Sequence, residues 1–521
     1  MMTKPKLKNT KKSSFNLNTI FTNNSKKTNK LSKSTKSKYI SKLSIISLDY
    51  LKKKNNAKIY KDIIISFYAL NNPIITYLVE YNDNESKKLI RNGLNNLKLV
   101  EAYKIPDIED KLKEIDLTYK IHQDLLKELK LKDIPKIVKY ASEDFTRGIR
   151  SFLDSRYKHL PINLSNGFVK LWEILHIFKV MDTTSHPHSQ TMNVFHIAEA
   201  PGQMVLCAKY YCEKKNINIT NYEWRANSLN PYNYEVKKKY GALRDDYKLI
   251  KNNPQKWIWG ADNTGDITKV INIKWFRKYI DTKWLKNNGE KNKDVKAAKL
   301  DLIIGDGGLG ADTNSIYNLQ KLDLAQVINV IACSSVGGSC VIKHFTSYMI
   351  NKPKETIDAT SFFISFIYLY YICFEEVNLF KPYTSDATSG EFYVIGKRFK
   401  GIDEKQLDKL YIILDKFKTN NSIFPKEAIP ETFMKQMYSF LDLLTKYNIK
   451  GYEKQNLLLS CYKEETKHKS KHKSKHKSKH NNNNDDDDEV NETCKLFMND
   501  KNIENILIPR YNQWIKINEF E

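Results

Sequence analysis

The stretch VFHIAEAPGQM (194–204) decides the fold that we expect for this chain. It begins as an apolar strand and breaks into a Pro-Gly turn, after which a helix is expected. Gly202 lets the backbone approach a ligand that a Cβ atom would exclude, and the first amides of the helix favour a carboxylate or a phosphate. The GxGxxG pattern of dinucleotide-binding folds is absent here. The stretch predicts a ligand-binding turn of a parallel α/β sheet, with an ordinary strand–helix turn as the alternative.

The alternation of strands and helices extends over residues 141–402 on both sides of this turn. We expect strands at 194–200, 220–226, 300–306, 338–343, 373–380 and 391–397, and helices at 165–181, 203–215, 314–335 and 353–370. The last two strands, with KPYTSDATSG (381–390) between them, predict an antiparallel hairpin that closes one edge of the sheet. The apolar stretch SFFISFIYLYYICF (361–374) is too short for a membrane span and predicts a buried helix that runs into a strand.

Four charged residues lie in or at the ends of these elements, in the order Lys, Asp, Lys, Glu. They are Lys170 in SNGFVKLWEIL (165–175), Asp306 in LDLIIGDGG (300–308), Lys343 in GGSCVIKHF (337–345) and Glu391 in EFYVIGKRF (391–399). Three of them lie on successive strand edges. The set is suited to the deprotonation of a ribose hydroxyl.

Lys343 is the candidate base of this set. An exposed lysine carries its proton at pH 7, but burial and the neighbouring Lys170 lower its pKa, while Asp306 and Glu391 raise it. A neutral lysine can take the proton of a ribose 2′-OH while that oxygen attacks a sulfonium methyl group. Two structural alternatives stand beside this interpretation: a strand-end lysine that reaches solvent, and an aspartate that caps the next helix.

Taken together, these motifs resemble the FtsJ-like ribose 2′-O-methyltransferase family. The resemblance covers about residues 143–402 and rests on FVKLWEI, EAPGQM, LDLIIGDGG, GSCVIKHF and GEFYVIGKRFKG. The long segment 144–175 ahead of the Pro-Gly turn and the KP…EFYVIGKRFKG ending bring the chain nearest to the mRNA-cap and large-DNA-virus branches. The resemblance implies an α/β fold, a Rossmann-like S-adenosylmethionine-dependent methyltransferase fold, in which helices flank a mostly parallel seven-stranded sheet, with helical N- and C-terminal extensions.

The resemblance also implies roles for the four charged residues. Lys343 would be the general base, Asp306 and Lys170 would position the 2′-OH and tune Lys343, and Glu391 would complete the tetrad. We expect no metal at this site.

S-adenosyl-L-methionine is the cofactor that the resemblance implies. The residues expected to contact it are Glu199, Ala200, Pro201 and Gly202 at the methionine end, Asp266 in TGDIT (264–268) at the adenine amino group, and Asp306. Asp266 has an alternative role as the cap of a turn in its own loop.

The sequence departs from the family at three points. Gln203 and Met204 replace the second glycine and the aromatic residue after Pro-Gly, and Ser385-Asp386 stands where cap enzymes often carry Ser-Arg. The strand at 220–226 ends without a clear ribose-binding acid.

The function that follows from the resemblance is S-adenosylmethionine-dependent ribose 2′-O-methylation of RNA, with capped mRNA as the expected substrate. An rRNA 2′-O-methyltransferase and an inactive RNA-binding or scaffold subunit remain alternatives. The expected partners are RNA and the capping or transcription machinery, with no membrane partner. The net charge of +26 fits a polyanionic partner, although a lysine-rich composition from an AT-rich genome, such as that of a large cytoplasmic DNA virus, explains much of it.

The seven cysteines form no CxxC pair, and the N-terminus has no apolar signal segment. Both observations favour an intracellular, reducing compartment, such as the host cytoplasm or the virion of a virus.

Composition divides the chain into six segments. We expect a disordered basic arm at 1–40, an accessory region at 41–140, the methyltransferase domain at 141–402, a helical C-terminal extension at 403–465, a low-complexity linker at 466–490, and a segment at 491–521 that packs back onto the body. The repeat KHKSKHKSKHKSKH (467–480) fits a disordered linker better than a metal-binding tract.

Overall fold

The computed structural model describes thirteen parts of the chain. They are residues 74–78, 93–130, 148–157, 160, 164–182, 190–215, 221–241, 244–286, 299–308, 316–346, 356–419, 421–475 and 500–520. The expected basic arm at 1–40 and most of the expected linker lie outside these residues.

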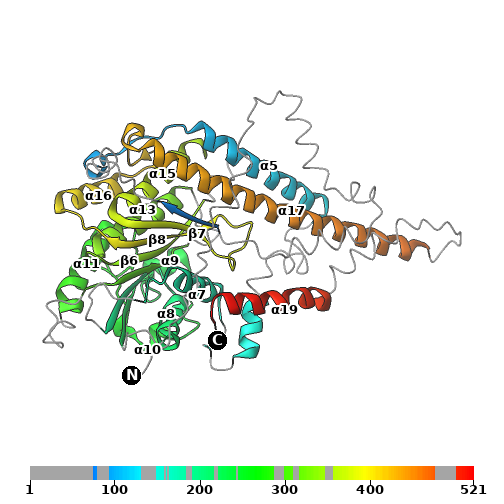
Figure 1. Ribbon diagram of the computed structural model, residues 1–521, viewed down its shortest axis with the longest axis horizontal. Helices are drawn as coiled ribbons and strands as arrows, with labels where there is room; N and C mark the ends of the chain where they lie inside the picture. Colours follow the sequence, from blue (N-terminus) through cyan, green and yellow to red (C-terminus); the bar gives the residue numbers. More distant parts are fainter. Residues whose placement is uncertain are drawn as a thin grey trace, which may run out of the picture. The chain divides into compact units, whose positions relative to one another are not determined.

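A seven-stranded sheet in the order β1-β7-β8-β6-β5-β3-β4 forms the centre of the fold (Figure 1). Its strands are β1 (Ile74–Leu78), β3 (Thr191–Ile197), β4 (Asn221–Ala226), β5 (Leu302–Gly305), β6 (Ser339–Phe345), β7 (Phe374–Lys381) and β8 (Glu391–Phe399). β3, β4, β5 and β6 pair in parallel, β8 runs antiparallel to β6 and β7, and β1 runs antiparallel to β7. The expected α/β fold with a mostly parallel seven-stranded sheet is confirmed.

The edge of the sheet beyond the hairpin differs from our expectation. The β7–β8 hairpin forms, but it does not close the sheet, because β1 adds a further strand with Ile74 opposite Lys381 and Leu78 opposite Val377. A short strand within the expected accessory region therefore completes the sheet. The pattern IITYL indicates a strand but cannot identify a partner that lies about three hundred residues away.

Helices cover both faces of the sheet, because strand residues alternate between two apolar clusters. Val194 of β3 packs with α7 (Asn166–Phe178) and α8 (Gln203–Lys214). Phe195 faces the opposite side, where α11 (Val270–Tyr279), α13 (Ile316–Cys333) and α15 (Thr356–Cys373) lie. The four helices expected from the sequence are confirmed, with ends shifted by a few residues. As expected, α15 is buried and runs directly into β7.

Short elements connect these layers. They are the 3-10 turns η2 (Leu94–Asn96), η3 (Pro254–Lys256) and η6 (Lys426–Ala428), the π-helical turn η4 (Ile280–Trp284), the helices α9 (Tyr234–Tyr240) and α10 (Leu249–Asn252), and the pair β2 (Val100–Glu101) and β9 (Asn421–Ser422). In the described parts of the chain, no helix is long and apolar enough to cross a membrane.

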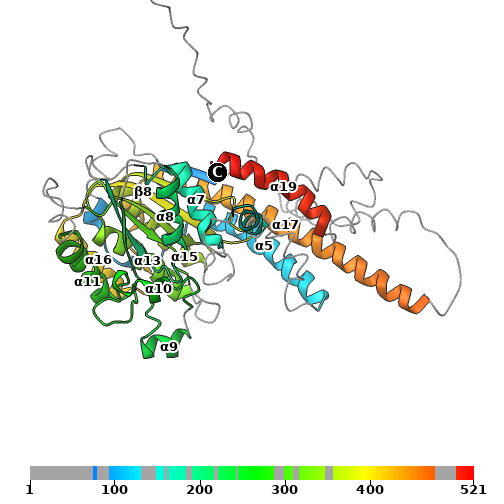
Figure 2. The ribbon, with the colours of Figure 1, turned by 90° about the horizontal axis from the view of Figure 1, so that it is seen from below.

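Two helices outside the sheet region pack lengthwise against each other. α5 (Pro106–Glu128) lies along α17 (Glu431–Lys475), where His122 Nδ1 is 3.0 Å from Asn456 Oδ1 (Figures 1 and 2). Helix α16 (Glu404–Lys416) precedes α17, as expected. However, α17 continues to Lys475, so the first part of the KHKS repeat is helical rather than a disordered linker.

The final helix, α19 (Asp500–Ile517), packs on α7, which confirms the expected docking of the C-terminal segment. Trp172 Nε1 donates to the carbonyl of Asn518 over 3.0 Å, and the rings of Trp172 and Phe520 lie 4.7 Å apart. The helix that carries Lys170 is therefore held from outside by the end of the described chain.

Candidate active site

The four charged residues predicted from the sequence meet at one edge of the sheet as two ion pairs. Lys170 Nζ of α7 lies 2.5 Å from Glu391 Oε1 at the start of β8, and Lys343 Nζ of β6 lies 2.6 Å from Asp306 Oδ1 after β5. Three of the side chains are only 10–12% exposed, while Asp306 is 29% exposed. The set is sheltered, yet a molecule can reach it from the side of Asp306.

The two ion pairs also interact with each other electrostatically, because Lys343 of one pair acts on Glu391 of the other. Burial alone would raise the pKa of Glu391, but Lys170, Lys343 and Lys381 lower it to about 2. The Glu391 carboxylate is therefore ionised at neutral pH.

The direction of the pKa of Lys343 corrects our expectation of a lysine poised to lose its proton. Burial lowers this pKa, but Asp306 and Glu391 outweigh burial and raise it above the ordinary value for lysine. In the substrate-free site, Lys343 is an ammonium that donates to Asp306.

Lys381 is a buried residue next to Glu391 that sequence reasoning missed. Its side chain is buried, and Nζ donates to Ser385 Oγ at 3.1 Å, to the Ser389 carbonyl at 2.8 Å and to the Glu391 carbonyl at 2.9 Å. Ser385 Oγ in turn lies 3.3 Å from Glu391 Oε1. Burial lowers the pKa of Lys381 to about 8. A lysine at the end of an apolar strand and directly before a proline was the available signal.

Glu173, one turn after Lys170, is the second residue that the sequence did not disclose. It is fully buried, and its carboxylate accepts from Tyr383 N at 2.8 Å, from Thr384 Oγ1 at 3.1 Å and from Trp514 Nε1 at 3.4 Å. One carboxylate thus joins α7, the loop between β7 and β8, and α19. Burial outweighs these hydrogen bonds and raises its pKa to about 7.

Glu173 should give the stability of this protein a pH dependence. Because its pKa rises from 4.5 to about 7 on folding, the folded protein keeps a proton that the unfolded chain releases between these values. The contribution of Glu173 to the free energy of unfolding therefore falls by up to about 3 kcal/mol as pH rises from 4.5 to 7. Urea unfolding of wild type and Glu173→Gln across this window should show a shallower decline for the variant. Parallel curves would contradict the assignment.

The Pro-Gly turn, residues Glu199–Gly202, follows β3 and leads into α8, and we call it the cradle. Gly202 precedes α8 with φ = +105°, which favours glycine, and a Cβ atom there would lie 2.3 Å from Leu249 Cδ1. The peptide bond between Ala200 and Pro201 is cis. The positive φ therefore favours glycine here, and the side chain of Leu249 occupies the space that a Cβ atom would take.

Glu199 beside this turn is buried, and only one of its two carboxylate oxygens accepts a hydrogen bond within the described residues. Its Oε1 accepts from Met204 N at 2.7 Å, whereas Oε2 accepts no hydrogen bond within the described residues. Burial, together with Asp306, raises its pKa well above the ordinary value. Oε2 is fully buried, and His196 Nδ1, which also has no hydrogen-bond partner among the described residues, lies 3.9 Å from it.

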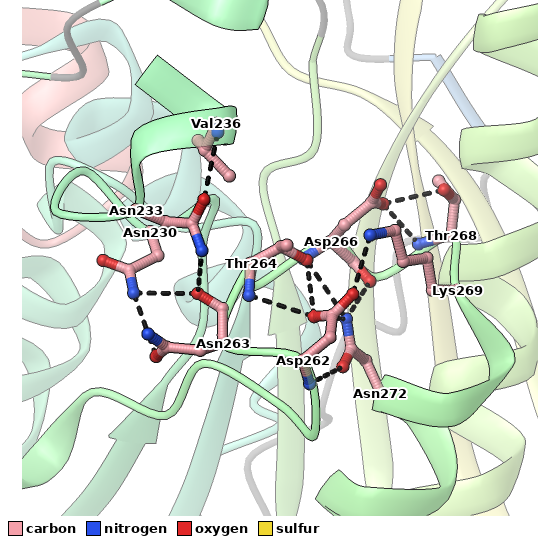
Figure 3. A network of polar contacts seen from close by, with 10 residues as sticks. All are labelled: Asn230, Asn233, Val236, Asp262, Asn263, Thr264, Asp266, Thr268, Lys269 and Asn272. Atoms are coloured by element: carbon pink, nitrogen blue, oxygen red, sulfur yellow. Dashed lines mark hydrogen bonds and ion pairs between the residues drawn. The ribbon is translucent and has the colours of Figure 1, made fainter. Parts of the chain in front are cut away.

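Asp266 caps its own loop in this structure, as the alternative reading of TGDIT states. Its Oδ1 accepts from Thr268 N at 2.9 Å and from Thr268 Oγ1 at 2.7 Å, within the network drawn in Figure 3. After β4, Asn227 donates to the carbonyls of Ile258 and Gly265, and its Oδ1 is buried without a partner among the described residues. The loops after β4 and before α11 are thereby joined.

Comparisons with known proteins agree with this geometry. Residues 164–399, which contain all the predicted site residues, match the family described as FtsJ-like methyltransferase. The uncharacterized protein L511 of Acanthamoeba polyphaga mimivirus is 30% identical over 298 residues, which are 56% of this chain and 33% of that protein. The cap-specific mRNA (nucleoside-2′-O-)-methyltransferase 2 of Pongo abelii is 26% identical over 302 residues, 57% of this chain and 36% of that enzyme.

A viral protein is matched over more of its own length. The probable methyltransferase EP424R of African swine fever virus is 24% identical over 313 residues, 56% of this chain and 63% of that protein. The chain spans about a third of the first two relatives.

Proposed function

We propose that this chain, whose residues 164–399 form an FtsJ-like methyltransferase domain, methylates a ribose 2′-hydroxyl of RNA. The observation that carries the proposal is the pair of short contacts that bring Lys170, Glu391, Lys343 and Asp306 to one sheltered edge of the sheet. An arrangement with two cations and two carboxylates can hold a hydroxyl group and accept its proton.

S-adenosylmethionine fits the cradle at the Pro-Gly turn and, when bound, supplies an electrophilic methyl group on a positively charged sulfur. We infer that Glu199, directly before the turn, faces its amino group, and Gly202 keeps the backbone close. We infer that Ala200 and Pro201 line the same end, while Asp266 holds the adenine-side loop and offers its second oxygen. Asp306 contacts Lys343 at 2.6 Å and is close enough to Glu199 to raise its pKa.

Lys343 performs the proton transfer in this proposal. Lys343 Nζ would accept the 2′-OH proton, and the bound cofactor would supply its methyl group to the 2′-oxygen and keep the electron pair of the broken carbon–sulfur bond on sulfur. Lys343 must be neutral at that moment, although Asp306 and Glu391 raise its pKa in the substrate-free site. A positive charge close to Lys343 opposes that effect, so an occupied cradle favours the neutral lysine.

Capped mRNA is the substrate class that we propose. The support is the similarity over 302 residues to an enzyme named as a cap-specific mRNA (nucleoside-2′-O-)-methyltransferase. We assign Lys170 and Asp306 to the positioning of the acceptor hydroxyl, and Glu391 to the orientation of Lys170.

The test is methyl transfer from labelled S-adenosylmethionine to a panel of RNAs of one sequence. Capped RNA without ribose methylation, capped RNA already methylated at the first nucleotide, uncapped RNA and ribosomal RNA should be compared. We expect transfer to capped RNA only, with nuclease digestion placing the methyl group on a ribose. Equal transfer to uncapped RNA would contradict the cap assignment, and no transfer to any RNA would contradict the enzymatic function.

A further inference from the structure

Exposed tyrosines and consecutive lysines lie together on the segment 232–239, which follows β4. Tyr232 is 71% exposed and Tyr234 is 72% exposed, the highest values among the exposed large apolar side chains of the described residues. Three exposed lysines follow directly on α9, namely Lys237, Lys238 and Lys239. Glu235 is the one acidic residue of the segment, so its net charge is +2 (three lysines less one glutamate). We call this group the Tyr-Lys patch.

The backbone beneath the Tyr-Lys patch is fixed by an asparagine network (Figure 3). Asn230 Oδ1 accepts from Tyr232 N at 2.9 Å, and Asn233 Oδ1 accepts from Val236 N at 3.2 Å. The side-chain amides of both asparagines donate to the Asn263 carbonyl, at 2.9 and 3.2 Å. The two tyrosines are therefore exposed on a backbone that these hydrogen bonds hold in place. A fixed backbone presents both rings to solvent, which lowers the entropy that a bound molecule would cost.

The Tyr-Lys patch lies beside the proposed cofactor loop and apart from the tetrad. β4 is parallel to β3, so the segment leaves the sheet at the same edge as the Pro-Gly turn. Asp266 is close enough to contribute to the raised pKa of Lys239, whose first cause is the hydrogen bond with Tyr240. Helix α9 lies at the periphery of the ribbon (Figure 2). The patch therefore projects from the same edge of the sheet as the Pro-Gly turn.

Aromatic faces next to consecutive ammonium groups are the chemistry that binds single-stranded nucleic acid. Bases stack on aromatic rings without regard to sequence, and lysines neutralise the neighbouring phosphates. We propose that Tyr232, Tyr234 and Lys237–Lys239 bind single-stranded RNA that flanks the acceptor nucleotide. The proposal rests on the proposed function for its choice of RNA, and it assigns a second contact region to the same substrate.

Two variants separate the aromatic from the ionic contribution. Tyr232→Ala/Tyr234→Ala removes both rings, and Lys237→Ala/Lys238→Ala/Lys239→Ala removes the ammonium groups. The matched control is Lys405→Ala/Lys409→Ala/Lys416→Ala, which removes three exposed lysines from α16. Because all these side chains are exposed, the thermal unfolding midpoints should stay near that of wild type, which verifies that each variant folds.

The measurement is the affinity of the full chain for a fluorescent oligouridylate and for an abasic oligomer of equal length, at several salt concentrations. The tyrosine variant should bind the oligouridylate about tenfold more weakly or worse, since a stacked base contributes roughly 1–3 kcal/mol and 1.4 kcal/mol is tenfold. Its affinity for the abasic oligomer should not change. The lysine variant should weaken both complexes and reduce the salt slope by about 0.7 for each lost phosphate contact.

Three outcomes would overturn the proposal: wild-type affinity of the tyrosine variant, equal loss for the abasic oligomer, or equal loss in the α16 control. Methyl transfer to a minimal capped acceptor, too short to reach the patch, keeps the two proposals distinguishable. If all variants still transfer the methyl group and also bind long RNA as wild type does, the RNA-binding role of the Tyr-Lys patch is contradicted and the proposed function is not. If the wild-type protein transfers no methyl group, the proposed function is contradicted, and the RNA-binding measurements still test the Tyr-Lys patch.

Discussion

Replacement of Lys343 by alanine or arginine is expected to lower kcat for methyl transfer by about 10²–10⁴-fold, which is the usual contribution of a positioned base. Alanine removes the amine that accepts the 2′-OH proton. Arginine keeps the positive charge beside Asp306, but its guanidinium does not deprotonate in proteins. A base role therefore predicts that both variants fail, whereas a purely electrostatic role predicts that arginine retains activity. Single-turnover transfer to capped RNA measures the effect.

Cofactor binding supplies the control for this experiment. The cradle residues Glu199–Gly202 do not include Lys343, so calorimetry should give Kd values for S-adenosylmethionine within a few-fold of wild type for both variants. Lys397→Ala is the matched control, because Lys397 lies on β8 in an ion pair with Glu376 and outside the tetrad. Near-normal turnover of Lys343→Ala would eliminate the proposed mechanism.

The pH dependence of the wild type follows from the same ion pair. Because Asp306 and Glu391 raise the pKa of Lys343, the free enzyme holds this lysine protonated throughout the neutral range. The kcat/KM value should therefore rise with pH between about 7 and 9, since it reports the free enzyme. A profile that is flat over this range would contradict Lys343 as the base.

The sequence predicted the fold well wherever apolar runs and breaks were local. The end of α15 and the start of β7 at residues 373 and 374 follow from an apolar run that meets Glu375 and Glu376. The tetrad was predictable as well, because parallel strands bring their carboxyl ends to one edge. Lys170 was found through the family resemblance, and the structure places it beside Glu391.

What the sequence did not disclose depends on contacts between distant segments. The pairing of β1 with β7 and the contact of Glu173 with Trp514 join residues hundreds of positions apart. The direction of the Lys343 pKa depends on a distance of 2.6 Å to Asp306, which no pattern encodes. Burial and opposing charges act in opposite directions, so the sign requires coordinates.

Lys381→Met should lower both the stability of the fold and the rate of methyl transfer. Methionine has a similar length but removes the Nζ donor to the Glu391 carbonyl and to Ser385 Oγ, whereas the Ser389 carbonyl still accepts from Asn448 Nδ2. An unsatisfied buried group costs about 1–3 kcal/mol. Loss of the buried ammonium itself offsets part of this cost. We therefore expect a loss of about 1–3 kcal/mol in urea unfolding. Lys397→Met, which breaks a partly exposed ion pair, should cost at most about 1 kcal/mol.

The effect of Lys381→Met on the rate should come through Glu391. Lys381 holds the loop and the backbone at Glu391, and its charge helps to lower the pKa of that carboxylate. A positioning role predicts that kcat falls at temperatures at which the variant is fully folded and that Kd for S-adenosylmethionine stays unchanged. A merely structural role would reduce the folded fraction and leave kcat per folded molecule unchanged. Since the pKa of Glu391 is about 2 with three lysines nearby, removal of one of them must raise it.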